Sequence, residues 1–296
     1  MINFSDGIER PNKFGGSEKK TTILLDGEIY MIKLPDPIRN VKIKEVMSYK
    51  NNQYSEHIGC LIFNACGINA QETIMGYFNT PKGKRKIVTG CKDFTQNGEI
   101  LYEMKKLANQ IDIDGESRQT TTIENIMLII DEIKEIKNKN DIKDKFWDMF
   151  VIDALIGNKD RHLDNWGIIE KNNEMMFAPV YDCGSALSAL LDEDTMEKLL
   201  SEPGSFRVEE YNVASIYRIG GERIYYHEIF RKPPKELADA VRRVVPKIDM
   251  TEIEIIIDSI ELMSNIRKDY LKKALSLRYE QVLIPAYSKI IEKTEK

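Results

Sequence analysis

The chain has 296 residues, of which 42% are hydrophobic and 31% charged, and its formal net charge is −5. This composition supports a packed core in one large domain or two lobes and excludes a disordered chain. The two signs of charge are interspersed, which argues against a nucleic-acid partner. Every apolar run is shorter than the ~20 residues that a membrane span needs. Four scattered cysteines without a CxxC pattern fit a reducing compartment. We therefore expect a cytoplasmic protein without a membrane segment, and secretion by a route without a signal peptide would leave no mark here.

The first third of the sequence predicts strands and one helix. A hairpin is expected over residues 21–34, because two β-rich runs flank Asp26-Gly27, which is a strong two-residue turn signal. A helix with Ser55 as its N-cap is expected over 54–66, where apolar residues recur at helical spacing. Two further strands are predicted over residues 71–78 and 85–92.

From about residue 97 the pattern becomes helical. Helices are predicted over residues 100–110, 121–137, 141–157, 235–245, 250–263 and 264–295. The helix over 141–157 is apolar nearly all round, so we expect it to be buried. A strand–turn–strand unit is expected over 166–180, whereas 185–225 gives no clear pattern. Together these elements predict an α+β fold with a small β-rich lobe, residues 1–95, and a mostly helical lobe, residues 96–296.

Three polar residues follow the buried helix at a spacing that suits phosphoryl transfer. Asp160 and Asn165 lie in one loop, and Asp182 follows the strand–turn–strand unit. Carboxylate and amide oxygens suit Mg²⁺, and an aspartate can take the proton of an acceptor hydroxyl. The same spacing occurs by chance in turns, but the buried helix before it and the hairpin after it favour catalysis. We expect His162 to be structural and Asp153, inside the buried helix, to be paired.

Residues of the first lobe could contact nucleotide phosphates. Lys33 lies on an otherwise apolar strand face and could pair with Glu56 on the next helix. Each alone is explained more readily by a strand-end lysine or a helix-terminal acid, but their order before the Asp-Asn-Asp set favours function. Gly15, Gly16 and Ser17 are a weaker signal for a phosphate-binding loop, since they do not match the P-loop pattern.

With these residues placed, the chain resembles the HipA-like serine/threonine kinases, and most of all their short bacterial forms. The most specific shared motifs are Asn158-x-Asp160-x-His162-x-x-Asn165 and Pro179-x-Tyr181-Asp182. The other shared segments are Phe14-Gly15-Gly16 and residues 30–35, 45–49, 91–94, 146–150 and 263–268. The resemblance therefore covers nearly the whole length of the chain.

This resemblance implies a two-lobed kinase that uses ATP and Mg²⁺ to phosphorylate serine or threonine of a protein substrate, including itself. It implies that Asp160 is the catalytic aspartate, that Asn165 and Asp182 bind the metal, and that Lys33 binds ATP phosphates. It further implies that Cys91, Lys92, Asp93 and Phe94 form a hinge whose backbone meets adenine.

Two departures limit the transfer of family properties. Longer HipA toxins carry an N-terminal subdomain before the glycine-rich loop, where this chain has only about a dozen residues, so an antitoxin partner is doubtful. Cys183 stands where eukaryotic kinases have phenylalanine, so their regulation is not expected here. Two other functions stay open: a small-molecule phosphotransferase of the aminoglycoside-kinase type, and a kinase-like module that binds nucleotide without turnover. The kinase-like module without turnover is disfavoured by the joint presence of Lys33, Asp160, Asn165 and Asp182.

Overall fold

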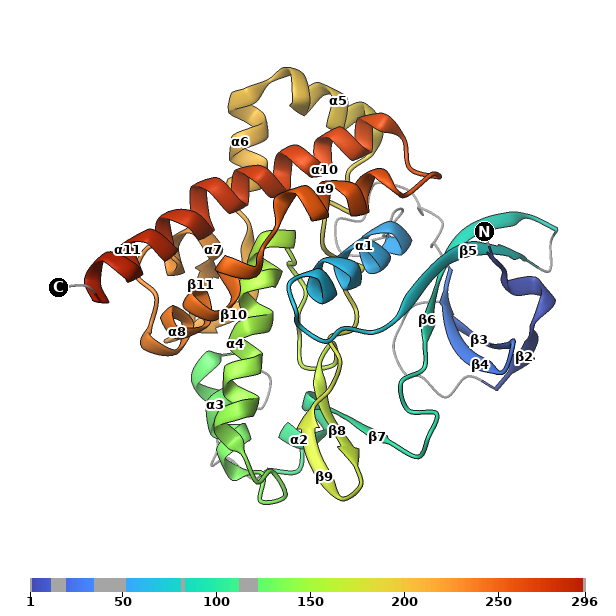
Figure 1. Ribbon diagram of the computed structural model, residues 1–296, viewed down its shortest axis with the longest axis horizontal. Coiled ribbons are helices and arrows are strands. Elements are labelled where there is room, and N and C mark those ends of the chain that lie inside the picture. The colour runs from blue at the N-terminus through green and yellow to red at the C-terminus, as the bar shows by residue number, and fades with distance from the viewer. Residues whose placement is uncertain (1, 12–19, 35–51, 81–82, 112–121, 295–296) are drawn as a thin grey trace.

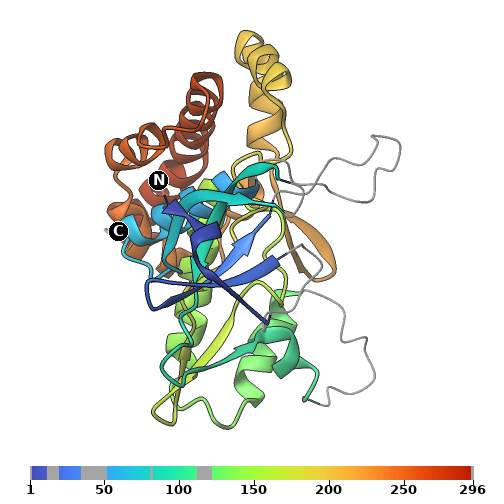
Figure 2. The same ribbon diagram turned by 90° about the vertical axis from the view of Figure 1, so that its right-hand side faces the viewer.

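The computed structural model describes residues 2–11, 20–34, 52–80, 83–111 and 122–294. A curved β-sheet stands at one side of the molecule, and a larger, mostly helical part fills the other side (Figure 1). Seen from the side of the sheet, the strands cross in front of the helices (Figure 2). This arrangement confirms the predicted α+β fold with a β-rich lobe and a larger helical lobe. The boundary at residues 95 and 96 stays a prediction.

The large sheet has six strands in the order β1-β5-β6-β4-β3-β2. They are β1 (Ile2–Asn3), β2 (Ile8–Arg10), β3 (Lys20–Leu25), β4 (Glu28–Lys33), β5 (Thr73–Asn79) and β6 (Arg85–Lys92). Strand β1 pairs parallel with β5, and the other neighbours are antiparallel. The β3–β4 hairpin turns at Asp26 and Gly27, whose φ angles of 52° and 85° are left-handed, as a two-residue turn requires. The predicted hairpin is therefore confirmed.

A small hydrophobic cluster packs on this sheet. Its buried members are Phe4, Ile23, Tyr30, Ile32 and Val88. The ring of Phe4 lies so close to the sheet that a Cβ atom would come within 2.7 Å of it at Gly76 and within 2.3 Å at Gly90. These two glycines therefore allow the 3-10 turn Phe4–Asp6 to close over β5 and β6.

The remaining elements are mostly helical. They are α1 (Asn52–Ala65), β7 (Ile100–Glu103), α2 (Met104–Ala108), α3 (Ile123–Glu132), α4 (Lys139–Ile156), β8 (Gly167–Lys171), β9 (Glu174–Phe177), α5 (Glu193–Ser201), α6 (Pro203–Tyr211), β10 (Ala214–Ile219), β11 (Glu222–Tyr225), α7 (Tyr226–Ile229), α8 (Lys235–Val244), the 3-10 turn Val245–Lys247, α9 (Met250–Asp258), α10 (Asn265–Arg278), the π-helical turn Tyr279–Leu283 and α11 (Ile284–Thr294). Strands β7, β8 and β9 form a second sheet, and β10 pairs with β11. Among the described residues, no helix combines the length and the apolar character required to cross a membrane.

Two expectations from the sequence change, and one segment without a prediction gains structure. The helix predicted over 100–110 is strand β7 followed by the short α2, because residues 100–103 pair with β8 and this pairing overrides the local helical pattern. Helix α1 begins at Asn52, so Ser55 lies buried inside the helix and is not its N-cap. The segment 185–225, which gave no clear pattern, contains α5, α6, β10 and β11; the buried residues of its helices are Met196 in α5 and Phe206 and Glu210 in α6.

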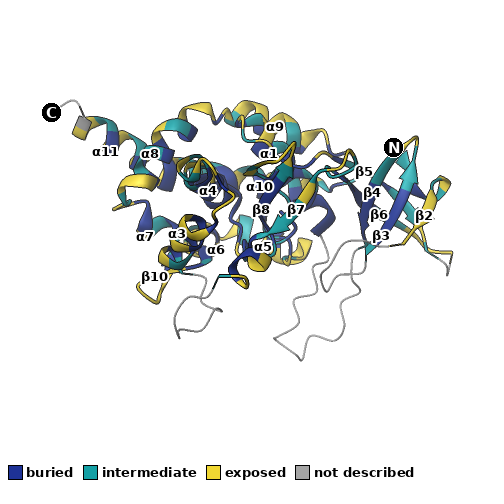
Figure 3. Ribbon diagram, turned by 90° about the horizontal axis from the view of Figure 1, so that it is seen from below, coloured by how far each residue is buried: buried dark blue, intermediate teal, exposed yellow. Residues whose placement is uncertain are grey.

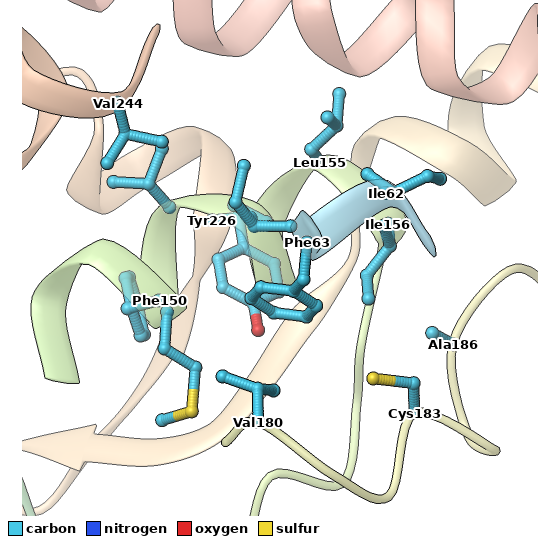
Figure 4. Packing of buried hydrophobic residues seen from close by; sticks show 14 of the residues in the cluster. Ile62, Phe63, Phe150, Leu155, Ile156, Val180, Cys183, Ala186, Tyr226 and Val244 are labelled. Atoms are coloured by element: carbon cyan, nitrogen blue, oxygen red, sulfur yellow. The ribbon is translucent and has the colours of Figure 1, made fainter. Parts of the chain in front are cut away.

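The main hydrophobic core surrounds α4, as its all-round apolar sequence predicted. Eleven of the 18 residues of α4 are buried. Figure 4 places Ile62 and Phe63 of α1 next to Ile156 of α4 within this core. Buried faces of the helices turn toward one another and exposed faces turn outward (Figure 3). Helix α1 therefore packs into the helical part of the molecule, although it lies between two strands of the large sheet in sequence.

Candidate active site

A buried lysine joins three separate elements. Lys33 at the end of β4 is 2% exposed, and its Nζ donates to Glu56 Oε2 of α1 at 2.9 Å and to Asp182 Oδ1 at 2.8 Å. The other oxygen of Glu56, Oε1, accepts the backbone N–H of Asp182 at 3.1 Å. The structure thus brings together three of the residues that the sequence singled out, from a strand, a helix and the segment after β9.

The charge state of Asp182 follows from this contact. Burial opposes ionisation of the carboxyl, but the adjacent Lys33 ammonium outweighs burial, so the pKa of Asp182 lies below its usual value. Asp182 therefore remains a carboxylate at neutral pH. An ionised carboxylate of this kind can bind a divalent cation.

A glycine on α1 permits this arrangement. A Cβ atom at Gly59 would lie 2.5 Å from the Cβ of Cys183, so only glycine lets α1 approach the segment after β9 so closely. Asp182 itself has a left-handed φ of 60°, a conformation that aspartate tolerates better than most residues. This close approach holds Glu56, one helical turn before Gly59, within hydrogen-bonding distance of Asp182.

The loop after α4 holds Asp160 by its backbone. Helix α4 ends at Gly157, which has a left-handed φ of 66° and turns the chain out of the helix. The backbone N–H of Asp160 donates to Asn158 Oδ1 at 3.0 Å, and its carbonyl accepts from Asn165 Nδ2 at 2.8 Å. Asn165 is therefore hydrogen-bonded directly to Asp160, so one loop holds both the predicted catalytic aspartate and a predicted metal ligand.

Arg161 organises the site and was given no role from the sequence. Its guanidinium donates from Nε to Asp153 Oδ2 and from Nη2 to Asp153 Oδ1, both at 2.9 Å. Its Nη1 donates to the carbonyls of Asn165, at 2.9 Å, and of Tyr181. Burial disfavours the charge of Arg161, but Asp153 outweighs burial and raises the pKa of Arg161. The signal for this role was Asp153 itself, since a buried carboxylate on an apolar helix needs a cation.

Burial and a neighbouring charge make Asp160 a stronger base. Burial raises the pKa of its carboxyl, the nearby Asp182 carboxylate adds to this effect, and His162 opposes it. The Nε2 atom of His162 lies 4.0 Å from Asp160 Oδ2. The Nδ1 atom of His162 accepts the backbone N–H of Asp164 at 3.2 Å, which agrees with the structural role expected for this histidine.

The donor set near Asp182 suits a magnesium ion bound together with phosphates. Asn165 and Asp182 both direct their backbone carbonyls to Arg161 Nη1, so their residues lie side by side. Within the described part of the chain, no group of three or more His, Cys, Asp or Glu side chains could hold a metal ion. A metal here would therefore depend on the carboxylate of Asp182, the amide oxygen of Asn165 and ligands from a bound phosphate group, a set that Mg²⁺ accepts.

Two residues of the predicted hinge already use their backbone N–H groups in hydrogen bonds within the protein. The backbone N–H of Lys92 donates to the carbonyl of Glu72, and that of Asp93 donates to the carbonyl of Ile29, each at 2.8 Å. The side chain of Lys92 forms ion pairs with Glu28, at 3.1 Å, and Glu72, at 3.3 Å. These ion pairs connect the end of β6 to the beginning of β4 and to the residue before β5.

Phe94 is the hinge residue with free backbone groups. The carbonyls of Lys92 and Asp93 accept hydrogen bonds from Gln71 and Gln96, at 2.9 Å and 2.8 Å. In contrast, the backbone N–H and C=O of Phe94 have no hydrogen-bond partner among the described residues. The ring of Phe94 contacts the ring of Tyr181, with the two ring centroids 6.0 Å apart. Tyr181 directly precedes Asp182 in the sequence. Of the predicted hinge, Phe94 is therefore placed best to meet a base.

Two predicted elements lie outside the described residues. They are the glycine-rich segment with Gly15, Gly16 and Ser17, and the shared motif over 45–49. The described chain resumes after the first of these at Lys20, which pairs with Lys33 across the β3–β4 ladder. Strand β3 therefore begins beside Lys33.

Comparison with known proteins identifies the family of this chain. The family described as HipA-like C-terminal domain matches residues 13–250. The serine/threonine-protein kinase CtkA of Helicobacter pylori (strain J99 / ATCC 700824) is 35% identical over 98% of this chain and 89% of that protein. The crystal structure of a Helicobacter pylori proinflammatory kinase CtkA superposes with a TM-score of 0.88 and 34% identity, covering 98% of each chain. The HipA complex of Shewanella oneidensis MR-1 with HipB and operator DNA, with a TM-score of 0.56 and 13% identity over 94% of this chain and 68% of that one, shares the fold.

The matches to CtkA cover 98% of this chain, and the family model covers residues 13–250. The fold and the sequence identity to the serine/threonine-protein kinase CtkA show that the chain is a kinase. The chain belongs to the HipA-like C-terminal domain family, and CtkA is a relative of similar length.

Proposed function

We propose that this protein is an ATP- and Mg²⁺-dependent kinase that phosphorylates serine or threonine residues of proteins, its own included. The observation that carries the proposal is the double contact of Lys33, which joins Glu56 to Asp182 beside the loop of Asp160. The name of the relative CtkA, a serine/threonine-protein kinase, supports the choice of acceptor.

Each part of ATP would meet a different element. The ammonium of Lys33 would bind phosphate oxygens as a point charge, with Glu56 keeping it in place. The free backbone groups of Phe94 would bind the adenine edge. Asp182 and the side-chain oxygen of Asn165 would hold Mg²⁺, which neutralises charge on the phosphates.

Asp160 would then act on the acceptor. The acceptor oxygen forms a bond to the γ-phosphorus while the bond from that phosphorus to the β–γ bridging oxygen breaks, and ADP leaves. The proton of the acceptor hydroxyl passes to the carboxylate of Asp160. Because burial raises the pKa of this carboxyl, Asp160 is a better proton acceptor than an exposed aspartate.

A small-molecule phosphotransferase is the second candidate, because it would use the same ATP chemistry. The two are separated by incubating the pure protein with Mg²⁺ and γ-labelled ATP, alone, with lysate proteins and with aminoglycosides. Label on protein serine or threonine, mapped by mass spectrometry, supports the proposal. Label on the small acceptors and none on protein would contradict it.

Variants of the protein test whether phosphate transfer depends on the proposed active site. Lys33→Met and Asp160→Asn should both lose transfer, because one removes the phosphate contact and the other the base. Asp269→Asn is the matched control, since its carboxylate is 66% exposed on α10 and, among the described residues, pairs with Lys272 alone. Transfer at the wild-type rate by Lys33→Met or by Asp160→Asn would contradict the role proposed for that residue.

A further inference from the structure

Ser185 makes a contact that the proposed chemistry has not used. The segment after Asp182 brings Ser185 back toward the loop after α4, and its Oγ donates to Asp160 Oδ2 at 3.3 Å. Sequence alone gave no reason to prefer this hydroxyl over the others that follow Asp182. The structure separates them, because Ser188 Oγ donates to Glu210 Oε1 and Ser201 Oγ to the carbonyl of Lys198, each at 2.7 Å.

The backbone hydrogen bonds of Asp160 do not fix the orientation of its side chain. Asn158 and Asn165 fix the backbone of Asp160 but leave its side-chain torsions free. The side chain is 33% exposed, so water competes for its oxygens. Within the described residues, the hydrogen bond from Ser185 is the one that reaches this carboxylate.

The other charged groups around Asp160 do not replace this contact. His162 Nε2 lies 4.0 Å from Asp160 Oδ2, beyond hydrogen-bonding distance. Arg161, from the same loop, directs its guanidinium to Asp153 and to backbone carbonyls. Asp182, on the facing segment, repels the carboxylate and is engaged by Lys33.

We propose that Ser185 is a positioning residue whose hydroxyl holds Asp160 Oδ2 and thereby keeps Oδ1 free to take the proton of the acceptor. The inference rests on the proposed role of Asp160 as the base. Ser185 lies three residues after Asp182, so the same hydrogen bond also fixes the base relative to the metal-binding segment. Such alignment matters because a displacement of about 1 Å can slow an enzyme about 100-fold.

The test compares side chains of equal shape with and without the hydroxyl. Ser185→Thr keeps a hydroxyl, Ser185→Val has the shape of threonine without it, and Ser185→Ala removes it with the least volume. We expect Val and Ala to lower kcat about 10- to 100-fold, with KM for Mg-ATP and Tm close to wild type. The Thr variant should recover most of kcat. Ser201→Ala, at the exposed end of α5, is the control and should match wild type.

The outcomes distinguish this role from the proposed function. Equal kcat values for the Thr and Val variants of an active enzyme would overturn the positioning role alone. Phosphate found on Ser185 of the wild type would also overturn it, since the residue would then be an acceptor. Absence of any transfer by the wild type would overturn the proposed function and, with it, the role of Ser185.

Discussion

The carboxylate of Asp153 accepts two hydrogen bonds, each 2.9 Å long, from the guanidinium of Arg161, and both side chains are fully buried. Through its remaining nitrogen, Arg161 also binds the carbonyls of Asn165 and Tyr181. This one ion pair therefore connects α4, the loop of Asp160 and the segment of Asp182. Its loss should affect both the stability of the fold and the alignment of the site.

We expect Asp153→Ala to lower the free energy of unfolding by about 3–5 kcal/mol, because it leaves Arg161 buried without its counter-ion. Asp148→Ala is the matched control on the same helix. Its partner Arg243 is 36% exposed, so this change should cost about 1 kcal/mol or less. Urea unfolding followed by circular dichroism measures both values, and similar losses would contradict the role of the buried pair.

Asp160→Ala should lower the rate of phosphate transfer by about 10²- to 10⁴-fold, which is the usual contribution of a general base. ATP binding should persist, because Lys33 and Asp182 remain in place. The rate is measured with γ-labelled ATP, and binding by the rise in Tm on adding Mg-ATP. A variant that transfers phosphate at the wild-type rate would exclude Asp160 as the base.

Asp182→Ala should remove the part of ATP binding that depends on Mg²⁺. In the wild type, Mg-ATP should raise Tm more than ATP with a chelator, because a ligand that binds only the folded state stabilises it. In the variant the two shifts should be equal. Asp164→Ala, which removes a surface pair with Lys105, should keep the difference. An unchanged Mg²⁺ effect in Asp182→Ala would argue against this ligand.

Local sequence signals predicted the parts of this molecule that depend on nearby residues. The Asp26-Gly27 turn, the buried helix α4 and the five-residue step from Asp160 to Asn165 all lie within short stretches, and each has a direct physical basis. The pairing of Lys33 with Glu56 was expected from their order in the sequence, whereas the contacts of these two residues with Asp182 were not.

Contacts between segments that are far apart in the chain could not be predicted from the sequence. Residues 100–103 form a strand because β8 pairs with them, and nothing in their own composition signals that partner. Arg161 binds the carbonyl of Tyr181, a backbone group that no side-chain pattern can indicate. The hydrogen bond from Ser185 to Asp160 is of the same kind, since either residue alone resembles an ordinary loop residue.

His57 should make the protein less stable in mild acid. Burial lowers the pKa of His57 from 6.5 to about 4 in the folded protein, where its Nδ1 contacts Thr73 Oγ1 at 2.8 Å. The unfolded chain therefore binds a proton that the folded protein does not. This contribution to stability is present in full above pH 6.5 and falls as the pH drops from 6.5 to about 4, by at most about 3 kcal/mol.

His57→Gln keeps a polar side chain but removes this titration. The free energy of unfolding of the wild type should fall more steeply with decreasing pH between 6.5 and 4 than that of the variant. Urea unfolding at several pH values in this range measures the two slopes. Identical slopes would show that His57 titrates normally in the folded state.

Phe94→Pro tests whether the hinge backbone meets the nucleotide. Proline has no backbone N–H, so the variant loses a donor that has no partner among the described residues. We expect KM for ATP to rise about 10-fold, the effect of one hydrogen bond of roughly 1 kcal/mol or slightly more. Phe94→Leu keeps the backbone and changes only the ring that contacts Tyr181, so it should raise KM less. Steady-state kinetics with varied ATP measure both changes. A larger effect from leucine than from proline would assign nucleotide binding to the ring of Phe94 and not to its backbone.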